Sequence, residues 1–304
     1  MGRKTKDSGI DGLLVVDKPA GWTSHDVVAK CRWAFGQRRA GHSGTLDPDA
    51  TGVLLLGFGR VTKLLNYLTI LPKTYTGEIV LGTETSTLDA SGEVTHTYDM
   101  SSVTFAKVVM AAKNFVGEIM QVPPMVSALS IDGVRLHTLA RQGIEVERQA
   151  RPVTIHSLSV NSEVEPGVFA ITATVSSGTY IRTLAADIGT VLGGGAHLRN
   201  LRRTRIGSFA AADGALLDEA IGTQTLLTPA QAMRDYPSCA VDEKTEVFVR
   251  NGRVLPLVDA WTGTGEAPAG DWLVLSQATE VLATYQRFRI DQAKPAVVVA
   301  RLED

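Results

Sequence analysis

Cysteine is nearly absent from this sequence, and long apolar runs are absent altogether. Its 304 residues contain two cysteines, Cys31 and Cys239, which lie far apart and without the spacing of metal ligands. We therefore expect neither a disulfide framework nor a zinc site. No apolar run is long enough to cross a bilayer, and the charged residues 1–10 precede no apolar segment of the signal-peptide type. These absences predict a cytoplasmic protein without a bound metal.

A large excess of one charge is absent as well. The formal net charge is −2, which disfavours a partner as acidic as a nucleic acid. The charge is divided unevenly, however: residues 1–210 contain 22 lysines and arginines against 18 aspartates and glutamates, whereas residues 211–304 contain 8 against 14. Phosphate binding needs only a local basic surface. We predict that a dense cluster in the basic part supplies that surface: Arg199, Arg202, Arg203 and Arg205.

The periodicity of apolar residues predicts interleaved strands and helices. Strands are expected at residues 12–16, 73–81 and 169–175, and helices at residues 24–35, 105–115 and 180–192. Ser24 is expected to cap the first of these helices. The sequence has neither a regular βαβ repeat nor a glycine-rich nucleotide fingerprint. It therefore predicts an α+β fold with a largely antiparallel sheet.

The composition changes near residue 228. From there on, prolines such as Pro229, Pro237, Pro256 and Pro268 separate short apolar runs at residues 246–249, 272–275 and 296–300, which we interpret as strands. The chain also exceeds the usual size of one domain. We therefore expect three parts: a flexible tail (residues 1–10), a main domain (residues 11–235) and a small β-rich C-terminal domain (residues 236–304).

The most distinctive segment is Arg39-Ala-Gly-His-Ser-Gly-Thr-Leu-Asp-Pro-Asp-Ala-Thr-Gly52. Pro48 disfavours the α conformation for the residue before it, so Asp47 is expected in an extended or turn conformation. Its neighbours are polar and an apolar run follows, which is how a scaffold presents a reactive group. By spacing alone, however, the segment is more typical of an ordinary surface loop with Asp-Pro turn chemistry.

The identity of the residues in this segment carries a stronger signal than their spacing. Gly41-His-Ser-Gly-Thr-Leu-Asp-Pro-Asp-Ala-Thr-Gly-Val-Leu54 resembles the catalytic motif of the TruB family, the bacterial tRNA pseudouridine-55 synthases. Further segments that resemble this family follow its order along most of the first 210 residues, at 14–27, 59–63, 73–75, 81–92, 177–185 and 195–207. The resemblance implies a mixed, largely antiparallel sheet with flanking helices and a central RNA-binding cleft. It also implies an isomerase that converts uridine 55 in the T-loop of tRNA to pseudouridine without a cofactor.

The resemblance assigns catalytic roles to three residues. Asp47 matches the family's catalytic aspartate, and carboxylates act as nucleophiles in glycosyl chemistry. Attack at the sugar, attack on the uracil ring and an elimination–addition route all remain open for it. Arg182 matches the arginine that pairs with the aspartate, and Tyr75 matches the tyrosine that stacks against the target base. Without the resemblance, Arg182 would be interpreted as a surface residue at a helix start and Tyr75 as a packed strand residue.

Five further positions match residues that line or support the family's substrate site. Tyr180 and Leu201 match residues of the uridine pocket. His42 matches a histidine that contacts the RNA loop near the flipped nucleotide. Lys18 and Asp89 match supporting positions, through a phosphate contact or through loop hydrogen bonds. The arginine cluster at residues 199–205 is expected to contact the RNA backbone.

Residues 122–152 resemble the family's RNA-gripping insertion but depart from its pattern. Val126, Ser130 and His137 stand where the family usually carries a tyrosine, a lysine and another tyrosine. The loss of these aromatic and cationic groups predicts a weaker grip on RNA or a changed tolerance of substrate. Many relatives also carry an RNA-binding PUA domain at the C-terminus, and residues 236–304 are compatible with a domain of that kind.

Two other functions compete with the isomerase. One is a tRNA-binding folding factor whose catalysis is secondary or lost, but the presence of Asp47 and Arg182 argues against a loss. The other is a carboxylate-based glycosidase, which needs two opposed carboxylates. Asp49 is too close in sequence to Asp47 to be a convincing partner. The sequence therefore predicts a monomeric isomerase that acts on tRNA, with no membrane and no small-molecule cofactor involved.

Overall fold

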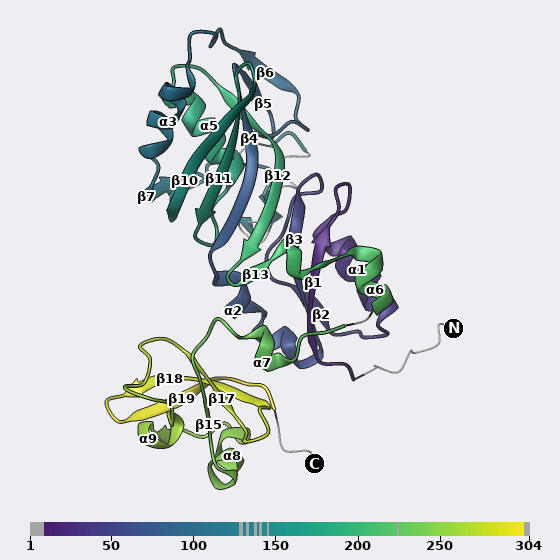
Figure 1. Ribbon diagram of the computed structural model, residues 1–304, viewed down its shortest axis with the longest axis vertical. Coiled ribbons are helices and arrows are strands. Elements are labelled where there is room, and N and C mark those ends of the chain that lie inside the picture. Colours follow the sequence, from purple (N-terminus) through teal and green to yellow (C-terminus); the bar gives the residue numbers. More distant parts are fainter. Residues whose placement is uncertain are drawn as a thin grey trace.

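The computed structural model describes residues 9–127, 130–131, 134–136, 139, 142–144, 146–223 and 225–300. The molecule is elongated, with a large sheet in its upper and middle parts and a smaller sheet at the opposite end (Figure 1). Within the described ranges, no helix is long and apolar enough to cross a membrane. Those ranges also contain no group of three His, Cys, Asp or Glu side chains placed to hold a metal ion, and both cysteines are buried and free.

The large sheet is mostly antiparallel. Its ten strands follow the order β14-β1-β3-β12-β4-β11-β10-β7, with β2 paired to β3 and β13 to β12. Two pairs are parallel, β1 with β14 and β3 with β12. The strands are β1 (Gly12–Lys18), β2 (Ala40–His42), β3 (Thr51–Phe58), β4 (Lys73–Leu81), β7 (Gly117–Gln121), β10 (Arg151–Glu165), β11 (Val168–Val175), β12 (Ala196–Ile206), β13 (Phe209–Ala210) and β14 (Ala215–Leu216). This arrangement confirms the predicted α+β class.

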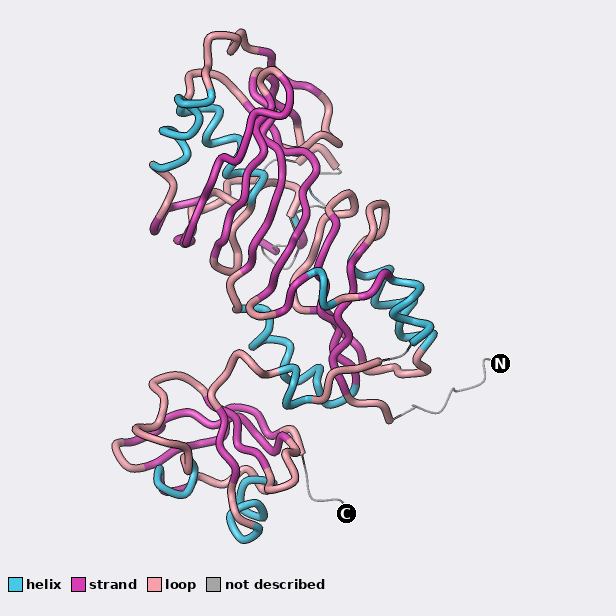
Figure 2. Tube along the Cα trace, viewed as in Figure 1, coloured by secondary structure: helices cyan, strands magenta, loops and turns pink. Residues whose placement is uncertain are grey.

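Helices cover this sheet in two groups (Figure 2). On one part of the sheet, α3 (Phe105–Lys113) and α5 (Ile181–Val191) share a core with β4, β10 and β11. On the other part, α1 (Ser24–Ala34) and α6 (Leu217–Thr223) pack against β1 and β3. The opposite face of β1 and β3 is covered by the 3₁₀ helix η1 (Gly59–Leu64), by α2 (Leu65–Ile70) and by α7 (Pro229–Ala232). Because strand side chains alternate between faces, β1 and β3 are buried on both.

The first helix is capped by a different residue from the one predicted. Thr23, not Ser24, is the N-cap: its hydroxyl accepts a hydrogen bond from the Asp26 amide, and the Asp26 carboxylate accepts one from the Thr23 amide. This reciprocal pair satisfies two amides that the first turn leaves free. Ser24 is the first helical residue and is buried, so its hydroxyl is available for a contact elsewhere in the fold.

Two short hairpins lie outside the large sheet. One joins β5 (Thr83–Thr85) to β6 (Val94–Thr97), and the other joins β8 (Ser130–Ile131) to β9 (Val134–Arg135). The second hairpin belongs to the segment that the sequence suggested as an RNA-gripping insertion. The loop of the first hairpin, between β5 and β6, reaches the site described below.

The C-terminal segment has a separate sheet but is not entirely β. Its five strands follow the order β15-β17-β18-β19-β16. They are β15 (Ser238–Ala240), β16 (Leu255–Pro256), β17 (Trp272–Leu275), β18 (Val281–Arg289) and β19 (Gln292–Val298), and two helices accompany them, α8 (Glu243–Arg250) and α9 (Leu257–Ala260). The predicted strand at residues 272–275 coincides with β17, and the one at residues 296–300 overlaps the end of β19.

The strand predicted at residues 246–249 is wrong, because these residues lie within α8. Asp242 caps this helix by accepting a hydrogen bond from the Thr245 amide. Arg250 forms an ion pair with Glu246 one turn earlier. These local interactions outweigh the preference of the short apolar run for a strand.

The small sheet shares a hydrophobic core with the main body of the chain. Leu273 and Val281 of this sheet pack in one cluster with Val61 of η1 and Leu68 of α2. A polar contact lies beside the cluster, where the Tyr67 hydroxyl is 2.5 Å from a carboxylate oxygen of Asp271 and 2.8 Å from the Thr284 hydroxyl. A joint that buries apolar side chains from both parts resists movement between them more than a polar linker does.

Gly52 shows how closely β3 approaches β12, and we predict that alanine is poorly tolerated there. Its φ is +106°, and a Cβ at this position would overlap the carbonyl oxygen of Arg203. Gly167 also has a positive φ, +75°, but a Cβ there meets no atom within 4 Å.

The Gly52→Ala variant is therefore expected to lower the free energy of unfolding by about 3 kcal/mol or more, because strain and overlap add. The control Gly167→Ala, which adds the strain alone, is expected to cost about 1 kcal/mol. Urea unfolding of both variants measures the difference. Equal losses would contradict the close approach of the two strands.

Candidate active site

Asp47 lies in the loop that joins β2 to β3, residues 43–50, which we call the Asp47 loop. Ser24 fixes the residue before Asp47: its hydroxyl accepts a hydrogen bond from the Leu46 amide (2.9 Å) and lies 3.2 Å from the Leu46 carbonyl, to which it donates. The Leu46 side chain is buried in the core beneath the pocket. The start of α1 therefore sets the position of the main chain next to the carboxylate.

Lys18 is a buried cation at the end of β1. Its ammonium group donates hydrogen bonds to the carbonyls of Pro19 (2.9 Å), Trp22 (2.8 Å) and Pro48 (3.0 Å). Burial lowers the pKa of Lys18 to about 8, and nearby carboxylates, Asp47 first among them, oppose this change. Of the two roles expected from the sequence, the geometry shows loop hydrogen bonds. A side chain with no exposed surface does not reach a phosphate.

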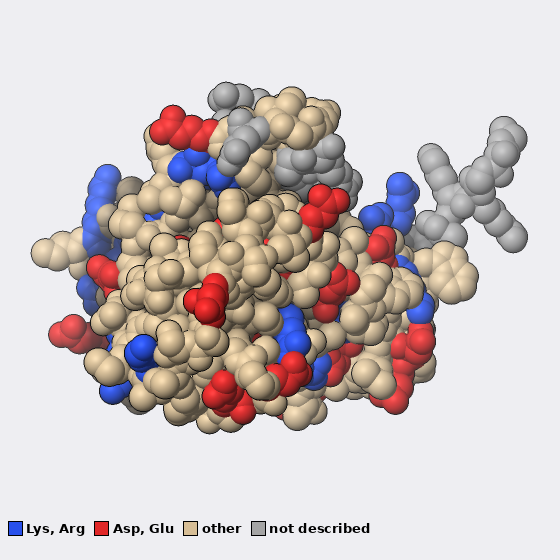
Figure 3. All heavy atoms as spheres, turned by 90° about the horizontal axis from the view of Figure 1, so that it is seen from above, with Lys and Arg blue, Asp and Glu red and all other residues tan. Residues whose placement is uncertain are grey.

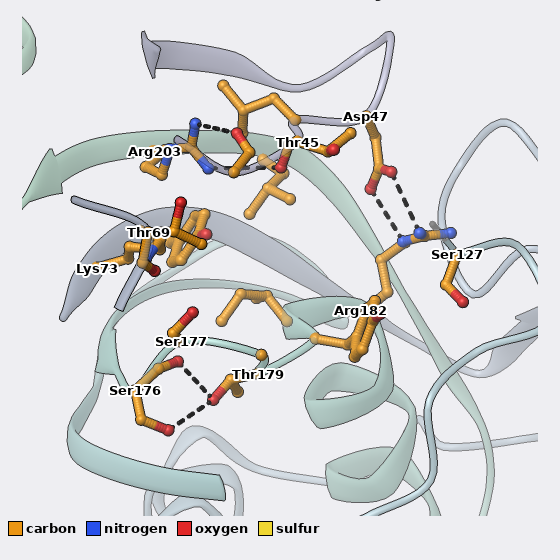
Figure 4. Close-up of a pocket in the computed structure, with 17 residues that line it drawn as sticks. Thr45, Asp47, Thr69, Lys73, Ser127, Ser176, Ser177, Thr179, Arg182 and Arg203 are labelled. Carbon is orange, nitrogen blue, oxygen red and sulfur yellow. Dashed lines mark hydrogen bonds and ion pairs between the residues drawn. The ribbon is translucent and has the colours of Figure 1, made fainter. Parts of the chain in front are cut away.

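The Asp47 carboxylate faces the guanidinium of Arg182, which comes from α5 (Figure 4). Nε of Arg182 lies 3.1 Å from Oδ2 of Asp47, and Nη2 lies 3.3 Å from Oδ1. This two-point pairing fixes the orientation of the carboxylate as well as its position. Burial raises the pKa of Asp47, and the positive charges of Arg182 and Lys18 oppose that rise. The Arg182 side chain is 4% exposed, whereas that of Asp47 is 38% exposed and open to a ligand.

Three further contacts hold the Arg182 guanidinium. Nη1 donates to the Thr87 carbonyl (3.0 Å) and lies 3.3 Å from a carboxylate oxygen of Asp89, while Nη2 donates to the Val126 carbonyl (2.8 Å). The other oxygen of Asp89 accepts hydrogen bonds from the hydroxyls of Thr87 and Ser91, each at 2.6 Å. Asp89 therefore belongs to the site through Arg182, and the guanidinium is held on all sides.

A pocket of about 220 Å³ opens beside the Asp47–Arg182 pair (Figure 4). Tyr75 of β4, Tyr180 at the start of α5 and Leu201 of β12 line it. A second cavity, of about 450 Å³, adjoins the first and is lined by Asp89 as well as by the same ion pair and Leu201. The fold thus brings together all three predicted catalytic residues and three of the predicted substrate-binding residues.

Gln121 is a buried residue of the site that the sequence did not single out. Its side-chain amide donates to the Tyr180 carbonyl (3.1 Å), and its side-chain oxygen accepts from the Tyr180 amide (2.8 Å). This pairing fixes the start of α5, two residues before Arg182. Its position in the sequence, at the end of β7 before two prolines, carries no signal of that role.

Lys73, the first residue of β4, also lies in the pocket wall and was not predicted. Its ammonium donates to the carbonyls of Thr69 (2.7 Å) and Leu71 (2.8 Å). Burial lowers the pKa of Lys73 to about 8, with a contribution from the nearby Arg203. The pocket wall therefore carries the buried Lys73 cation as well as the buried guanidinium groups of Arg182 and Arg203.

His42 ends β2, directly before the Asp47 loop. Its ring meets that of His25 edge to face, with 5.2 Å between the ring centroids. Burial lowers the pKa of His42 to about 4, with smaller contributions from His25 and Arg203. The imidazole is therefore neutral at physiological pH and presents an uncharged ring near the site.

Two members of the predicted arginine cluster are paired with carboxylates. Arg199 lies 2.5 Å from Glu78 and 2.7 Å from Glu165, and Arg202 lies 2.6 Å from Asp17. Basic and acidic side chains are likewise interspersed on the described part of the face seen from above (Figure 3). A phosphate that binds Arg199 or Arg202 would have to compete with these carboxylates.

Arg203 departs from the prediction that the whole cluster contacts RNA. Its side chain is 1% exposed and donates to the carbonyls of Val53 (2.8 Å), Gly44 (3.1 Å) and Thr45 (3.4 Å). A phosphate cannot reach a group buried in this way, so the prediction for Arg203 is wrong. Arg205, two residues along, is exposed and has no ion-pair partner among the described residues.

The structure describes only part of the three positions at which residues 122–152 depart from the family pattern, Val126, Ser130 and His137. Val126 contacts the site through its carbonyl, which accepts the hydrogen bond from Arg182, and this contact does not depend on the side chain. His137 and the side chain of Ser130 lie outside the described residues. Their effect on RNA binding stays a prediction.

The lowered pKa of His42 predicts a loss of stability in acid. An unfolded chain binds a proton at this residue below about pH 6.5, whereas the folded protein does not until about pH 4. Between these values protonation favours the unfolded state. We expect the free energy of unfolding to fall more steeply from pH 6.5 to pH 4 in the wild type than in His42→Gln. Urea unfolding at several pH values measures this dependence. The control is His156→Gln, because His156 is exposed. An equal pH dependence of the free energy of unfolding in all three proteins would contradict the prediction.

Comparison with known proteins covers nearly the whole chain. The sequence profile described as TruB family pseudouridylate synthase (N terminal domain) matches residues 32–181, and that of the tRNA pseudouridylate synthase B C-terminal domain matches residues 182–228. The tRNA pseudouridine synthase B of Streptomyces coelicolor is 44% identical over 270 residues, which are 86% of this chain and 90% of that protein. The protein of the same name from Symbiobacterium thermophilum is 47% identical over 255 residues, 83% of this chain and 85% of its own.

Solved structures agree with the fold. The structure described as a Cbf5-Nop10-Gar1 complex contains a chain that superposes with a TM-score of 0.73 at 24% identity, covering 95% of this chain and 85% of that one. The archaeal box H/ACA sRNP Nop10-Cbf5 complex gives a TM-score of 0.70 at 22% identity, with coverage of 95% and 86%. These comparisons confirm the resemblance seen in the sequence. The chain belongs to the TruB family of pseudouridylate synthases.

Proposed function

We propose that this protein isomerises uridine 55 in the T-loop of tRNA to pseudouridine, with Asp47 acting at the bond between ribose and base. The observation that carries the proposal is the two-point pair of Asp47 and Arg182 beside a pocket lined by Tyr75, Tyr180 and Leu201. The relatives named tRNA pseudouridine synthase B support tRNA as the substrate.

The reaction exchanges one bond of the uracil ring for another. The bond from ribose C1′ to N1 breaks and a bond from C1′ to C5 forms, while C5 gives up a proton and N1 gains one. Asp47 supplies a carboxylate, which can form a transient covalent bond to an electron-poor carbon. Tyr75 offers the detached base an aromatic face, and its phenol is suited to proton transfer. The pocket gives the base room to turn before it rejoins the ribose.

Arg182 serves Asp47 by orientation and by charge. Two nitrogens of one guanidinium hold both carboxylate oxygens, so the carboxylate does not rotate freely. The positive charge favours the ionised carboxylate, which is the nucleophilic form, although burial raises its pKa. Since Arg182 is itself buried and held by Asp89, it keeps this position while substrate binds and leaves.

The target uridine must leave the stacked T-loop before it reaches the pocket. His42 lies at the entrance of the Asp47 loop as a neutral ring, a group suited to stacking where an extruded base has been. Arg205 is exposed and free to bind a phosphate. Arg199 and Arg202 contribute once their carboxylate partners are displaced.

The arrangement of carboxylates argues against a glycosidase. Such an enzyme places two carboxyl groups on opposite sides of a sugar bond. Asp49 and Asp89 line the same cavity as Asp47, and Asp89 contacts the same guanidinium as Asp47 does. Asp49, the alternative considered from the sequence, is exposed on the same loop as Asp47.

The remaining expectations about organisation belong to the same proposal. Residues 11–235 form the catalytic domain and residues 236–304 a small C-terminal domain of PUA-like character. Separate sheets support this division, and the shared core explains how the two parts stay together. We expect the protein to act as a monomer on tRNA in the cytoplasm.

Replacing Asp47 with asparagine tests the proposal directly. Asp47→Asn removes the nucleophile but keeps the shape of the side chain, so product formation should fall by at least about 10³-fold while tRNA binding persists. The assay is incubation with an unmodified tRNA transcript, followed by mapping of pseudouridine and by a filter-binding measurement of affinity.

The control variant is Asp49→Asn, which changes an exposed carboxylate two residues away and should alter the rate by no more than about threefold. Product formed by Asp47→Asn at the wild-type rate would refute the assignment of Asp47. Product found at a uridine other than 55 would leave the reaction intact but overturn the proposed position.

A further inference from the structure

Arg203 is one of the largest fully buried side chains of the protein and carries a charge. It lies on β12, where its main chain pairs with Gly52 of β3 on one side and with Tyr75 of β4 on the other. Among the described residues, no carboxylate lies within ion-pair distance of it. A buried guanidinium without a carboxylate is costly, so its three hydrogen bonds show what keeps it in place.

Those hydrogen bonds connect the two ends of the Asp47 loop. Nη2 and Nη1 donate to the carbonyls of Gly44 (3.1 Å) and Thr45 (3.4 Å), at the start of the loop, as Figure 4 shows. Nε donates to the carbonyl of Val53 (2.8 Å), which lies in β3 just after the loop ends. The planar guanidinium has a fixed spacing between its nitrogens. Main-chain pairing already joins β2 to β3, and the Ser43 amide donates to the Leu55 carbonyl (3.0 Å). The Arg203 side chain adds a clamp further into the loop, which holds Gly44 and Thr45 to Val53.

We propose that Arg203 is a positioning residue, which closes the Asp47 loop from within the sheet and so places the carboxylate against Arg182. This inference rests on the proposed function only for its effect on rate. Although Arg203 forms part of the pocket wall, its guanidinium is directed at the main chain of Gly44 and Thr45 and is almost completely covered. It acts on the substrate through the loop.

Other contacts leave this task to Arg203. Ser24 fixes the loop at Leu46 and Lys18 fixes it at Pro48, so both act close to Asp47 and from the side of α1 and β1. Neither spans the loop, and the main-chain hydrogen bond from Ser43 to Leu55 reaches only the first residue of the loop. A lysine at position 203 would keep the charge. Its side chain is shorter and carries one nitrogen in place of a planar group of three, so it would not bind both ends of the Asp47 loop at once.

The test compares Arg203→Lys and Arg203→Met with Arg205→Gln. Arg205 lies on the same strand, is exposed and has a phosphate contact in the proposed function, so its variant shows what the loss of an RNA-binding charge does. Single-turnover rates are measured at saturating enzyme, and tRNA affinity is measured at several salt concentrations. Both Arg203 variants should lower the saturating rate by about 100-fold, because a shift of about 1 Å in a reacting group costs that much. Affinity and its salt dependence should stay unchanged in both Arg203 variants, whereas Arg205→Gln should weaken affinity and reduce its salt dependence.

Amide hydrogen exchange supplies a readout that does not depend on catalysis. In Arg203→Lys, the amides of residues 43–50 should exchange at least about tenfold faster than in the wild type, while those of β11 stay protected. This measurement also keeps the proposal testable if Arg203→Met does not fold. A saturating rate unchanged in Arg203→Lys, or unchanged exchange in the loop, would overturn the proposal.

The remaining outcomes separate this inference from the proposed function. A reduced salt dependence in Arg203→Met, which removes the charge, with an unchanged rate would show that Arg203 contacts phosphate after all, and would also overturn the proposal. A wild-type protein that forms no pseudouridine in tRNA would refute the proposed function, whereas faster exchange in the variant would still establish that Arg203 holds the loop.

Discussion

The guanidinium of Arg182 joins four parts of the chain that are far apart in sequence. It contacts Asp47 in the loop after β2, the turn that holds Thr87 and Asp89, and Val126 at the start of the insertion, while α5 carries it. Because the side chain is buried, the loss of any one contact leaves part of its charge unsatisfied in a medium that solvates it poorly. These segments therefore depend on one another, and the carboxylate reaches its working position only when the whole sheet has formed around α5.

The same pocket is surrounded by further buried cations whose partners are main-chain carbonyls. Lys18, Lys73 and Arg203 each donate to two or three carbonyl oxygens. The lowered pKa values of the two lysines show that their burial is unfavourable. In return, these hydrogen bonds fix loops that no regular secondary structure holds. The charge of Lys18 also opposes the rise in the pKa of Asp47 that burial causes. Stability is given up locally so that the loop beside one carboxylate is held in place.

The regular helices and strands could be predicted from the periodicity of apolar residues. Residues whose roles depend on a local departure from that regularity, such as a helix cap or a register shift, could not. The alternating strand at residues 73–81 was found at its full length, because its pattern repeats over nine residues. The run at residues 246–249 was too short to outweigh a capped helix. Arg203 and Arg205 should share a face of a regular strand, but a register shift between them leaves one buried and the other exposed. Asp47 was identified by its motif alone, since its spacing fits a surface loop equally well.

The ion pairs of the arginine cluster change what its charge contributes to RNA binding. Each phosphate contact made by a free cation releases a counterion from the RNA, and this release makes binding depend on salt. When Arg199 or Arg202 binds a phosphate, it must first leave Glu78 or Asp17, so part of the electrostatic gain replaces an interaction that already existed. In the proposed role of this cluster, the attraction for RNA would therefore be smaller than the number of arginines implies. Such pairs also hold Arg199 and Arg202 in place without RNA, which would lower the entropy that binding must overcome.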